Sequence, residues 1–349
     1  MKTYINNFDF LRFVFALFVV ITHSYALSGT PESAEWIWQI TGGQLSFSQI
    51  GLCGFFVISG YFIFTSLQRA SSLKIYFKNR ILRIFPGLLG VLCVTLLLIP
   101  FLHLQGFKIF TQWDYYTYVP RNMSLYGFQS IVKGVFDTNN YHAINGSLWT
   151  IRYEFSLYFI LAFLFYFKKH PWINHVLLAF SFIVMYVVYN FFFEQVAAMQ
   201  LFYLQGYHFF NLGTFFVVGS LLASLQFEKK NSIVLLCISL TVLILSIYFE
   251  VYNSVKHIVF PVVILSLGFI PLRYLSIFGK YGDSSYGIYI YSFPVQQVLV
   301  YFFKPKVYSL MMWSLLISII LGFLSWYFIE KKALNLKNKN KKILTVSIK

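Results

Sequence analysis

The chain has 349 residues, of which 58% are hydrophobic, 21% are aromatic and only 11% are charged. This composition excludes an ordinary water-soluble domain and is typical of an all-α, polytopic membrane protein. The net charge of +16 is divided into short clusters between apolar runs, so these clusters predict membrane topology and not a nucleic-acid surface.

The first apolar run, residues 7–28, contains Asp9, Arg12 and His23. An ionisable side chain in the middle of a span costs about 2.5 kcal/mol or more, so such groups usually face a protein interior and serve function. At about 100° and 1.5 Å per residue, Arg12 and His23 lie on one helix face, about 16 Å apart. Asp9, three residues before Arg12, joins that face. This stripe predicts a cation that holds an anionic group and an imidazole that moves a proton.

A structural interpretation of the same run stays open. Arg12 paired with Asp9 would then anchor one end of the span, and His23 would be an ordinary interfacial residue. Asp9 and Arg12 also argue against a cleaved secretory signal here, so we expect the segment to be retained.

The chain has ten apolar runs long enough to span a bilayer. They lie near 8–27, 49–67, 84–104, 147–167, 174–193, 207–227, 232–250, 257–272, 283–303 and 308–329. If the N-terminus is cytoplasmic, 20 of the 27 Lys and Arg residues lie inside, 6 lie outside, and Arg152 lies within a span. This asymmetry predicts about ten transmembrane helices with both termini inside.

The second run and the loop after it offer contact points for a ligand. Gly54, Ser59 and Gly60 would let a ligand or another helix approach closely. Arg80 and Arg83, three residues apart on one helix face, would bind phosphates or serve only as topology anchors.

Two outside segments, 28–48 and 105–146, are long enough for a lid or a re-entrant element. The aromatic and acidic side chains of the second would face a sugar or form an interfacial belt: Trp113, Asp114, Tyr115, Tyr116, Tyr118 and Asp137.

Glu154 lies about two turns inside the fourth run. It would pair with His23, since both lie toward the outer half in this topology, and would make the imidazole a better base. Neutralisation by Arg152 is the alternative, which is weakened because residues two apart on a helix point in nearly opposite directions.

The late run at 284–297 is broken by Pro294, which would kink the helix and open a cavity or be tolerated as structure. We expect one membrane-embedded domain over 1–330 and a basic, disordered cytoplasmic tail over 331–349. Cys53, Cys93 and Cys237 show no ligand spacing, so neither a disulfide framework nor a metal site is expected.

Short motifs follow one another along nearly the whole chain in a specific order. They are Arg12 and His23 separated by ten residues, FFVISGY at 55–61, Arg80-Ile81-Leu82-Arg83 with Pro86, Ser147-Leu148-Trp149 followed by Glu154, Ser285-Tyr286 through Phe293-Pro294-Val295, and Tyr327 to Lys331. Together they resemble the acyltransferase family 3, bacterial integral-membrane O-acyltransferases of cell-surface glycans. Two positions depart from the family pattern. Tyr291 and Ser292 replace a usual Leu-Trp-His, so no second histidine receives a role, and Lys332 replaces a usual proline.

The resemblance implies an O-acetyltransferase of the bacterial cytoplasmic membrane without the C-terminal hydrolase-like domain of some relatives. Its donor would be acetyl-CoA, used as a substrate with no permanently bound cofactor, and its acceptor a surface glycan or a lipid-linked sugar. His23, Arg12, Glu154 and Asp9 would form the catalytic group. Arg80 and Arg83 would contact the coenzyme together with Ser59 and Tyr61 of the second-run motif. Direct transfer and a covalent acyl-enzyme both remain open.

A transporter or flippase of a lipid-linked glycan or small anion is the alternative, because intramembrane His, Glu and Arg also mark substrate and proton paths. No inverted repeat is visible in the sequence. A transporter would work without coenzyme A, whereas a transferase would not.

Overall fold

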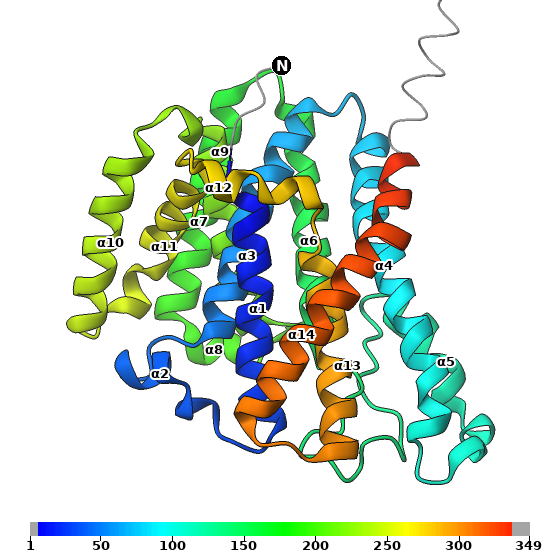
Figure 1. Cartoon of the computed structure of the whole chain (residues 1–349). Coiled ribbons are helices and arrows are strands. Elements are labelled where there is room, and N and C mark those ends of the chain that lie inside the picture. The colour runs from blue at the N-terminus through cyan, green and yellow to red at the C-terminus, as the bar shows by residue number, and fades with distance from the viewer. Residues whose placement is uncertain (1–5, 337–349) are drawn as a thin grey trace, which may run out of the picture. The chain divides into compact units, whose positions relative to one another are not determined.

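The computed structural model describes residues 6–336. Its helices in chain order are α1 Phe8–Leu27, α2 Trp36–Ile40, α3 Phe47–Arg69, α4 Leu73–Leu102, α5 Trp113–Met123, α6 Ile151–Leu161, α7 Pro171–Phe191, α8 Phe193–Ala197, α9 Gly206–Ser224, α10 Ser232–Tyr248, α11 Tyr252–Phe269, α12 Arg273–Ser276, α13 Ser285–Phe303 and α14 Val307–Ser325 (Figure 1). Two short strands, β1 Gln200–Leu201 and β2 Leu204–Gln205, form an antiparallel hairpin. The predicted all-α class is therefore confirmed.

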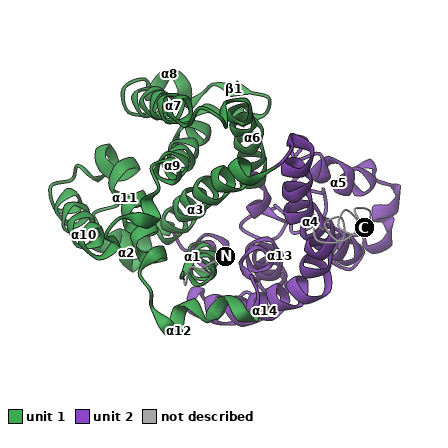
Figure 2. Cartoon of the chain, turned by 90° about the horizontal axis from the view of Figure 1, so that it is seen from above, with its two compact units in different colours: residues 1–22, 32–70, 150–281 green, residues 23–31, 71–149, 282–349 purple. Residues whose placement is uncertain are grey.

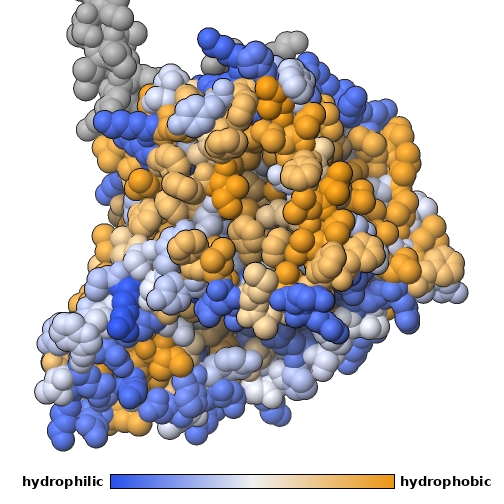
Figure 3. Space-filling view, turned by 180° about the vertical axis from the view of Figure 1, so that it is seen from behind, coloured by the Kyte–Doolittle hydropathy of each residue, from blue (hydrophilic) through white to orange (hydrophobic). Residues whose placement is uncertain are grey.

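Each of the ten predicted spans overlaps a helical segment. The helix α4 begins at Leu73, well before the predicted 84–104, and the predicted 147–167 combines α6 with a 3₁₀ segment on each side. Among the described residues, eight helices are long and apolar enough to cross a membrane, and α10, with 17 residues, is a shorter apolar helix. On the face in Figure 3, apolar side chains cover most of the middle and hydrophilic ones gather toward the upper and lower edges. The chain is thus a multi-pass membrane protein, whereas the count of ten and the orientation stay predictions.

Side chains define where the long helices begin. Ser46 caps α3 by accepting a hydrogen bond from the backbone N–H of Gln49 at 3.3 Å. Ser72 caps α4 in the same way through Ile75. The last helix runs on beyond α14 through a π-helical segment, Trp326–Glu330, and is helical up to residue 336, the last residue that the structure describes. The predicted tail therefore starts as helix at 331–336, and the rest of it lies outside the described residues.

The long outside segments contain short helices. Residues 28–48 form a 3₁₀ turn and α2, and residues 105–146 contain a 3₁₀ segment, Gly106–Thr111, followed by α5. Trp113 and Tyr116 are exposed, but Tyr118 is fully buried and its hydroxyl accepts from Thr95 Oγ1 at 3.3 Å. Tyr118 therefore belongs to neither the sugar-facing surface nor the interfacial belt considered for this segment, because it packs against α4.

The chain folds into two compact units that alternate along the sequence (Figure 2). Unit 1 comprises residues 1–22, 32–70 and 150–281, and unit 2 comprises 23–31, 71–149 and 282–349. The helix α1 passes from unit 1 into unit 2 after Thr22. The prediction of one domain over 1–330 is not tested by this division, because a domain can contain several compact units.

In unit 1, glycines let three helices approach closely. A Cβ on Gly60 of α3 would lie 1.9 Å from the carbonyl oxygen of Phe216 on α9, and a Cβ on Gly54 would lie 2.3 Å from the ring of Phe15 on α1. Ser220 of α9 also donates to the Gly60 carbonyl at 2.9 Å. The small residues of α3 thus serve helix packing, one of the two roles considered for them.

The helices of unit 1 share two ends. At one end, the Asn7 amide donates to the carbonyls of Leu267 and Ile270. At the other, Ser48 N–H donates to Thr22 Oγ1 at 2.9 Å. The first end, called the basic end below, carries Arg12, Arg69, Lys168, Lys169, Lys229, Lys230, Arg273 and Lys280, whereas the opposite end carries Arg152 and Lys256.

Unit 2 is built around α4, α13 and α14. Gly287 of α13 faces Gly322 of α14, where a Cβ would lie 2.8 Å from the opposite Cα. The loop before the 3₁₀ turn Gly146–Thr150 is fixed to α13, because Gln297 donates to the carbonyls of Tyr141 and Ala143. This close packing places the late sequence motif beside the loop that precedes α6.

Candidate active site

The predicted polar stripe lies on one uninterrupted helix, α1. Arg12 Nη1 and Asp9 Oδ1 form an ion pair at 3.2 Å, and both side chains are only partly exposed. The guanidinium carbon of Arg12 also lies 5.3 Å from the ring centroid of Phe62 on α3. Gly279 approaches Asp9 so closely that a Cβ there would lie 2.4 Å from Oδ2. Asp9 therefore has a local partner and orients the guanidinium.

His23 lies near the other end of α1, in unit 2. Its ring packs edge-on against Phe293 of α13, with 5.2 Å between the ring centroids. Gly146 makes room for Phe293, since a Cβ there would lie 2.6 Å from that ring. The His23 Nδ1 atom is buried and has no hydrogen-bond partner within residues 6–336. A ring fixed by packing with one unpartnered nitrogen is suited to accept a proton from a bound hydroxyl.

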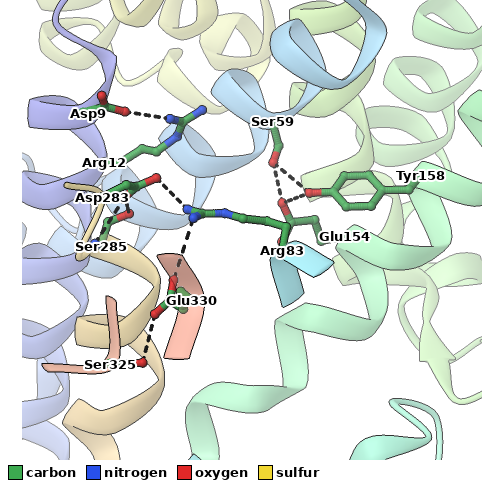
Figure 4. Close-up of polar contacts among 10 residues, drawn as sticks. All are labelled: Asp9, Arg12, Ser59, Arg83, Glu154, Tyr158, Asp283, Ser285, Ser325 and Glu330. Atoms are coloured by element: carbon green, nitrogen blue, oxygen red, sulfur yellow. Dashed lines mark hydrogen bonds and ion pairs between the residues drawn. The ribbon is translucent and has the colours of Figure 1, made fainter. Parts of the chain in front are cut away.

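Glu154 on α6 lies in unit 1 and has two hydroxyl partners. Ser59 of α3 and Tyr158, one turn along α6, both donate to its Oε1 atom, as Figure 4 shows. Within the described part of the chain Glu154 forms no ion pair, so neutralisation by Arg152 is not observed. The predicted pairing of Glu154 with His23 stays a prediction.

The basic motif of α4 is tied to acidic residues inside unit 2. Arg83 Nη2 lies 2.5 Å from Asp283 Oδ2, and Nη1 lies 3.7 Å from Glu330 Oε2 (Figure 4). Glu330 is 1% exposed and accepts a further hydrogen bond from Ser325 at 2.9 Å. Ser285 donates to Asp283. We call Arg83, Asp283 and Glu330 the ionic triad. It joins α4, the start of α13 and the π-helical segment.

The remaining predicted coenzyme residues are divided between the units. The guanidinium carbon of Arg80 lies 5.9 Å from the Tyr76 ring centroid in unit 2. Tyr61 belongs to unit 1, where its hydroxyl donates to Glu228. The hydroxyls of Ser59 and Tyr61 both donate hydrogen bonds to carboxylates. Their contact with a coenzyme stays a prediction.

Sequence reasoning missed the acidic partners. Glu228, Asp283 and Glu330 each receive a hydrogen bond from a hydroxyl or an ion pair from a guanidinium. Glu330 could have been singled out from the sequence, because an acid at the end of an apolar run needs a partner. Asp283 and Glu228 lie between the long helices, Glu228 in a short 3₁₀ turn, where an acid gives no such signal.

Comparisons with known proteins show the family of this chain. The model of a family described as "Acyltransferase domain" matches residues 5–331. An O-acetyl transferase of Shigella phage Sf6 is 29% identical over 347 residues, covering 94% of this chain and 96% of the phage protein. Nodulation protein 10 of Rhizobium leguminosarum bv. viciae is 33% identical over 174 residues, covering 45% of this chain and 43% of that protein. No solved structure matches the chain.

Proposed function

This chain belongs to the acyltransferase family 3, and from that premise we propose that it is an O-acetyltransferase that moves an acetyl group from acetyl-CoA to a hydroxyl of a cell-surface polysaccharide sugar. The family favours an enzyme over the transporter considered from the sequence. The observation that carries the mechanism is His23, whose ring is fixed by Phe293 while its Nδ1 has no partner among the described residues.

The distribution of charge in unit 1 supports a cytoplasmic N-terminus. Among the described residues, the basic end, where α1 begins, carries eight Lys and Arg residues, and the opposite end carries two. Basic side chains collect on the cytoplasmic side of bacterial membrane proteins. The proposal therefore places Arg12 toward the cytoplasm and His23 toward the outside, in the bacterial cytoplasmic membrane.

The arginines are the groups that would receive the donor. Coenzyme A carries phosphates, which planar guanidinium groups bind through paired N–H donors. Arg12 and Arg83 already contact carboxylates, so a phosphate has to share the guanidinium or displace an acid. Arg80, stacked near Tyr76, is the third candidate.

In direct transfer, the acceptor hydroxyl oxygen attacks the thioester carbonyl carbon while His23 takes the hydroxyl proton. The carbon–sulfur bond then breaks, and coenzyme A leaves as a thiolate that is protonated from His23 or water. An acyl-enzyme would divide the same changes between two steps. Glu154, held by Ser59 and Tyr158, is proposed to support this chemistry from α6.

The first test replaces His23 with alanine. A general base contributes roughly 100- to 10,000-fold to rate, so His23→Ala should reduce acetylation at least about 100-fold. Acetyl groups on purified surface polysaccharide are measured by NMR in a host that lacks its own enzyme. Inverted membrane vesicles given labelled acetyl-CoA test the donor.

His142→Ala provides the control, because His142 is exposed. It should retain wild-type acetylation at equal protein level. Normal acetylation by His23→Ala would refute the proposed base. Absence of label from acetyl-CoA in wild-type polysaccharide would refute the donor.

A further inference from the structure

A buried lysine in unit 1 belongs to none of the predicted site motifs. Lys256 on α11 is 9% exposed. Its Nζ donates to the hydroxyl of Tyr189 on α7 and to Oδ1 of Asn253, at 3.0 Å each. Within residues 6–336 it forms no ion pair. Both observed acceptors are neutral, so the ammonium has no counter-charge.

An ammonium in this position has a substantial energetic cost. Removing an ion from water costs several kcal/mol unless an opposite charge compensates it. An ammonium also has three N–H donors, and only two have acceptors among the described residues. A neutral side chain would satisfy Tyr189 equally well. A lysine at this buried position therefore points to an anion that approaches the third donor.

A row of rings connects Lys256 with a second cation, Arg152. Lys256 Nζ lies 4.9 Å from the first ring centroid, and the Arg152 guanidinium carbon lies 5.3 Å from the last. Neighbouring centroids are 5.0 to 6.0 Å apart in the order Tyr189, Tyr207, His208 and Tyr153. We call these four side chains the ring row. Aromatic faces pack against the C–H faces of sugars, and the cations at each end suit acidic substituents.

A second unsatisfied polar atom lies beside the same row. His257 is fully buried and its Nε2 lies 3.0 Å from Oδ1 of Asn211, so Nε2–H donates to the amide oxygen. Its Nδ1 is left as an acceptor without a partner in the described part of the chain. The His257 ring lies 4.9 Å from that of Tyr189, the ring that Lys256 also contacts. An acceptor beside a cation matches a hydroxyl beside an acid group on one sugar.

The middle of the ring row has access to solvent at one end of unit 1, whereas Tyr189 and Tyr153 at the two ends of the row are buried. Tyr207 and His208 are partly exposed at the start of α9, next to the β1–β2 hairpin. The contributing helices α6, α7, α9 and α11 all belong to unit 1 (Figure 2). They meet here at the end opposite the basic end. In the proposed orientation this end faces the outside, where the acceptor is.

We propose that Lys256 and the ring row bind an acidic saccharide, with Lys256 holding its carboxylate or phosphate group. This inference rests on the proposed function for the identity of the ligand as acceptor. The binding chemistry itself requires only the residues of unit 1. It can therefore be tested without any acyl transfer.

The experiment measures thermal unfolding of the purified full-length protein in phosphatidylcholine nanodiscs without acyl donor. The probes are methyl glucuronide, glucose 1-phosphate and the neutral methyl glucoside, each titrated to millimolar concentrations. A ligand that binds only the folded state raises Tm with concentration. We expect both acids, or one of them, to raise Tm far more than the neutral sugar.

Lys256→Met should weaken acid binding about tenfold or more, since it removes a charge-assisted hydrogen bond. Lys304→Met, at an exposed lysine of unit 2, is the matched control and should bind normally. If Lys256→Met does not fold, Tyr207→Leu tests the ring row by the same titration and should weaken binding of the acids.

The outcomes separate the sources of the acid group. Stabilisation by the glucuronide alone assigns a sugar carboxylate, and stabilisation by glucose 1-phosphate alone assigns a phosphate on the sugar or its lipid carrier. Absence of an acid effect on the wild type, or an acid effect that persists in the variant, overturns the proposal. A null result here leaves the His23 test intact, because the two assays share no readout.

Discussion

At the residue scale, the polar side chains of this protein are arranged in small groups with definite partners. Glu154 accepts hydrogen bonds from two hydroxyls, and Arg12 forms an ion pair with Asp9. His23 differs, since its Nδ1 has no partner within residues 6–336. An unpartnered nitrogen is expected of a general base that accepts a proton from the bound substrate.

Glu35, in the segment before α3, illustrates how burial acts on a single acid outside the spans. It is fully buried and accepts a hydrogen bond from the backbone N–H of Phe47 at 3.0 Å. Burial raises the pKa of Glu35, and the hydrogen bonds from Phe47 and Thr22 oppose that effect only in part. The folded protein therefore holds the Glu35 proton more tightly than the unfolded chain does.

The sign of the pH dependence follows from this pKa. Between the ordinary carboxyl pKa and the raised one, the folded state binds more protons, so stability falls as pH rises through that interval. Glu35→Gln keeps an acceptor for Phe47 without a charge. Its Tm should match the wild type at about pH 4 and exceed it at neutral pH.

Thermal unfolding in detergent from acidic to neutral pH measures this difference. Glu194→Gln, at an exposed position, is the control and should follow the wild-type curve. A Glu35→Gln curve parallel to that of the wild type would show that Glu35 does not carry the effect.

At the element scale, close helix contacts hold the helices of each unit together, and a partly buried ionic group adds to them in unit 2. Glycines bring α3 against α9 in unit 1 and α13 against α14 in unit 2. The ionic triad adds a polar connection between α4 and the start of α13. The motif around Arg83 therefore has a structural role in addition to any contact with phosphate.

Removing Arg83 should destabilise unit 2. Arg83→Met removes the cation that contacts both Asp283 and the buried Glu330, and breaking a buried ion pair costs about 3–5 kcal/mol. The Arg83 side chain is 26% exposed, so water reaches it and the lower end of that range is expected. Thermal unfolding in detergent measures the change.

The triple variant Arg83→Met, Asp283→Asn and Glu330→Gln separates the two roles. It removes the two carboxylate charges together with the cation and should recover much of the lost Tm. If Arg83 also binds donor phosphate, the triple variant keeps a raised KM for acetyl-CoA. An unchanged Tm in Arg83→Met would contradict the structural role.

At the scale of the whole molecule, the distribution of basic residues gives the orientation. The basic end of unit 1 includes the exposed Lys229, while the β1–β2 hairpin with the exposed Leu201 lies at the opposite end. This arrangement agrees with the Lys and Arg asymmetry of the sequence. It predicts that a reagent that cannot cross the membrane reaches position 201 from outside the cell but does not reach position 229.

Single cysteines test the orientation in spheroplasts. In a background where the exposed Cys93 and Cys237 are serine, Leu201→Cys should react with a membrane-impermeant maleimide in intact spheroplasts. Lys229→Cys should react only after lysis. The reverse pattern would invert the orientation and place His23 on the cytoplasmic side.

The sequence by itself determined the helical class, the approximate positions of the long helices and the face shared by Arg12 and His23. These features follow from apolar run length and helical period, which are local properties of the chain. The order of the short motifs also identified the family. The motif spacing identified His23, Glu154 and Arg83 as candidates.

Only the tertiary structure decided which side chains meet. Residues 83, 283 and 330 come together across about 250 positions, and no local pattern specifies such a contact. The same holds for Ser59 with Glu154, and for Lys256 with Tyr189. Tyr118 looked like a surface aromatic for the same reason. Burial and partners depend on packing between distant helices, whereas helix formation depends on the local chain.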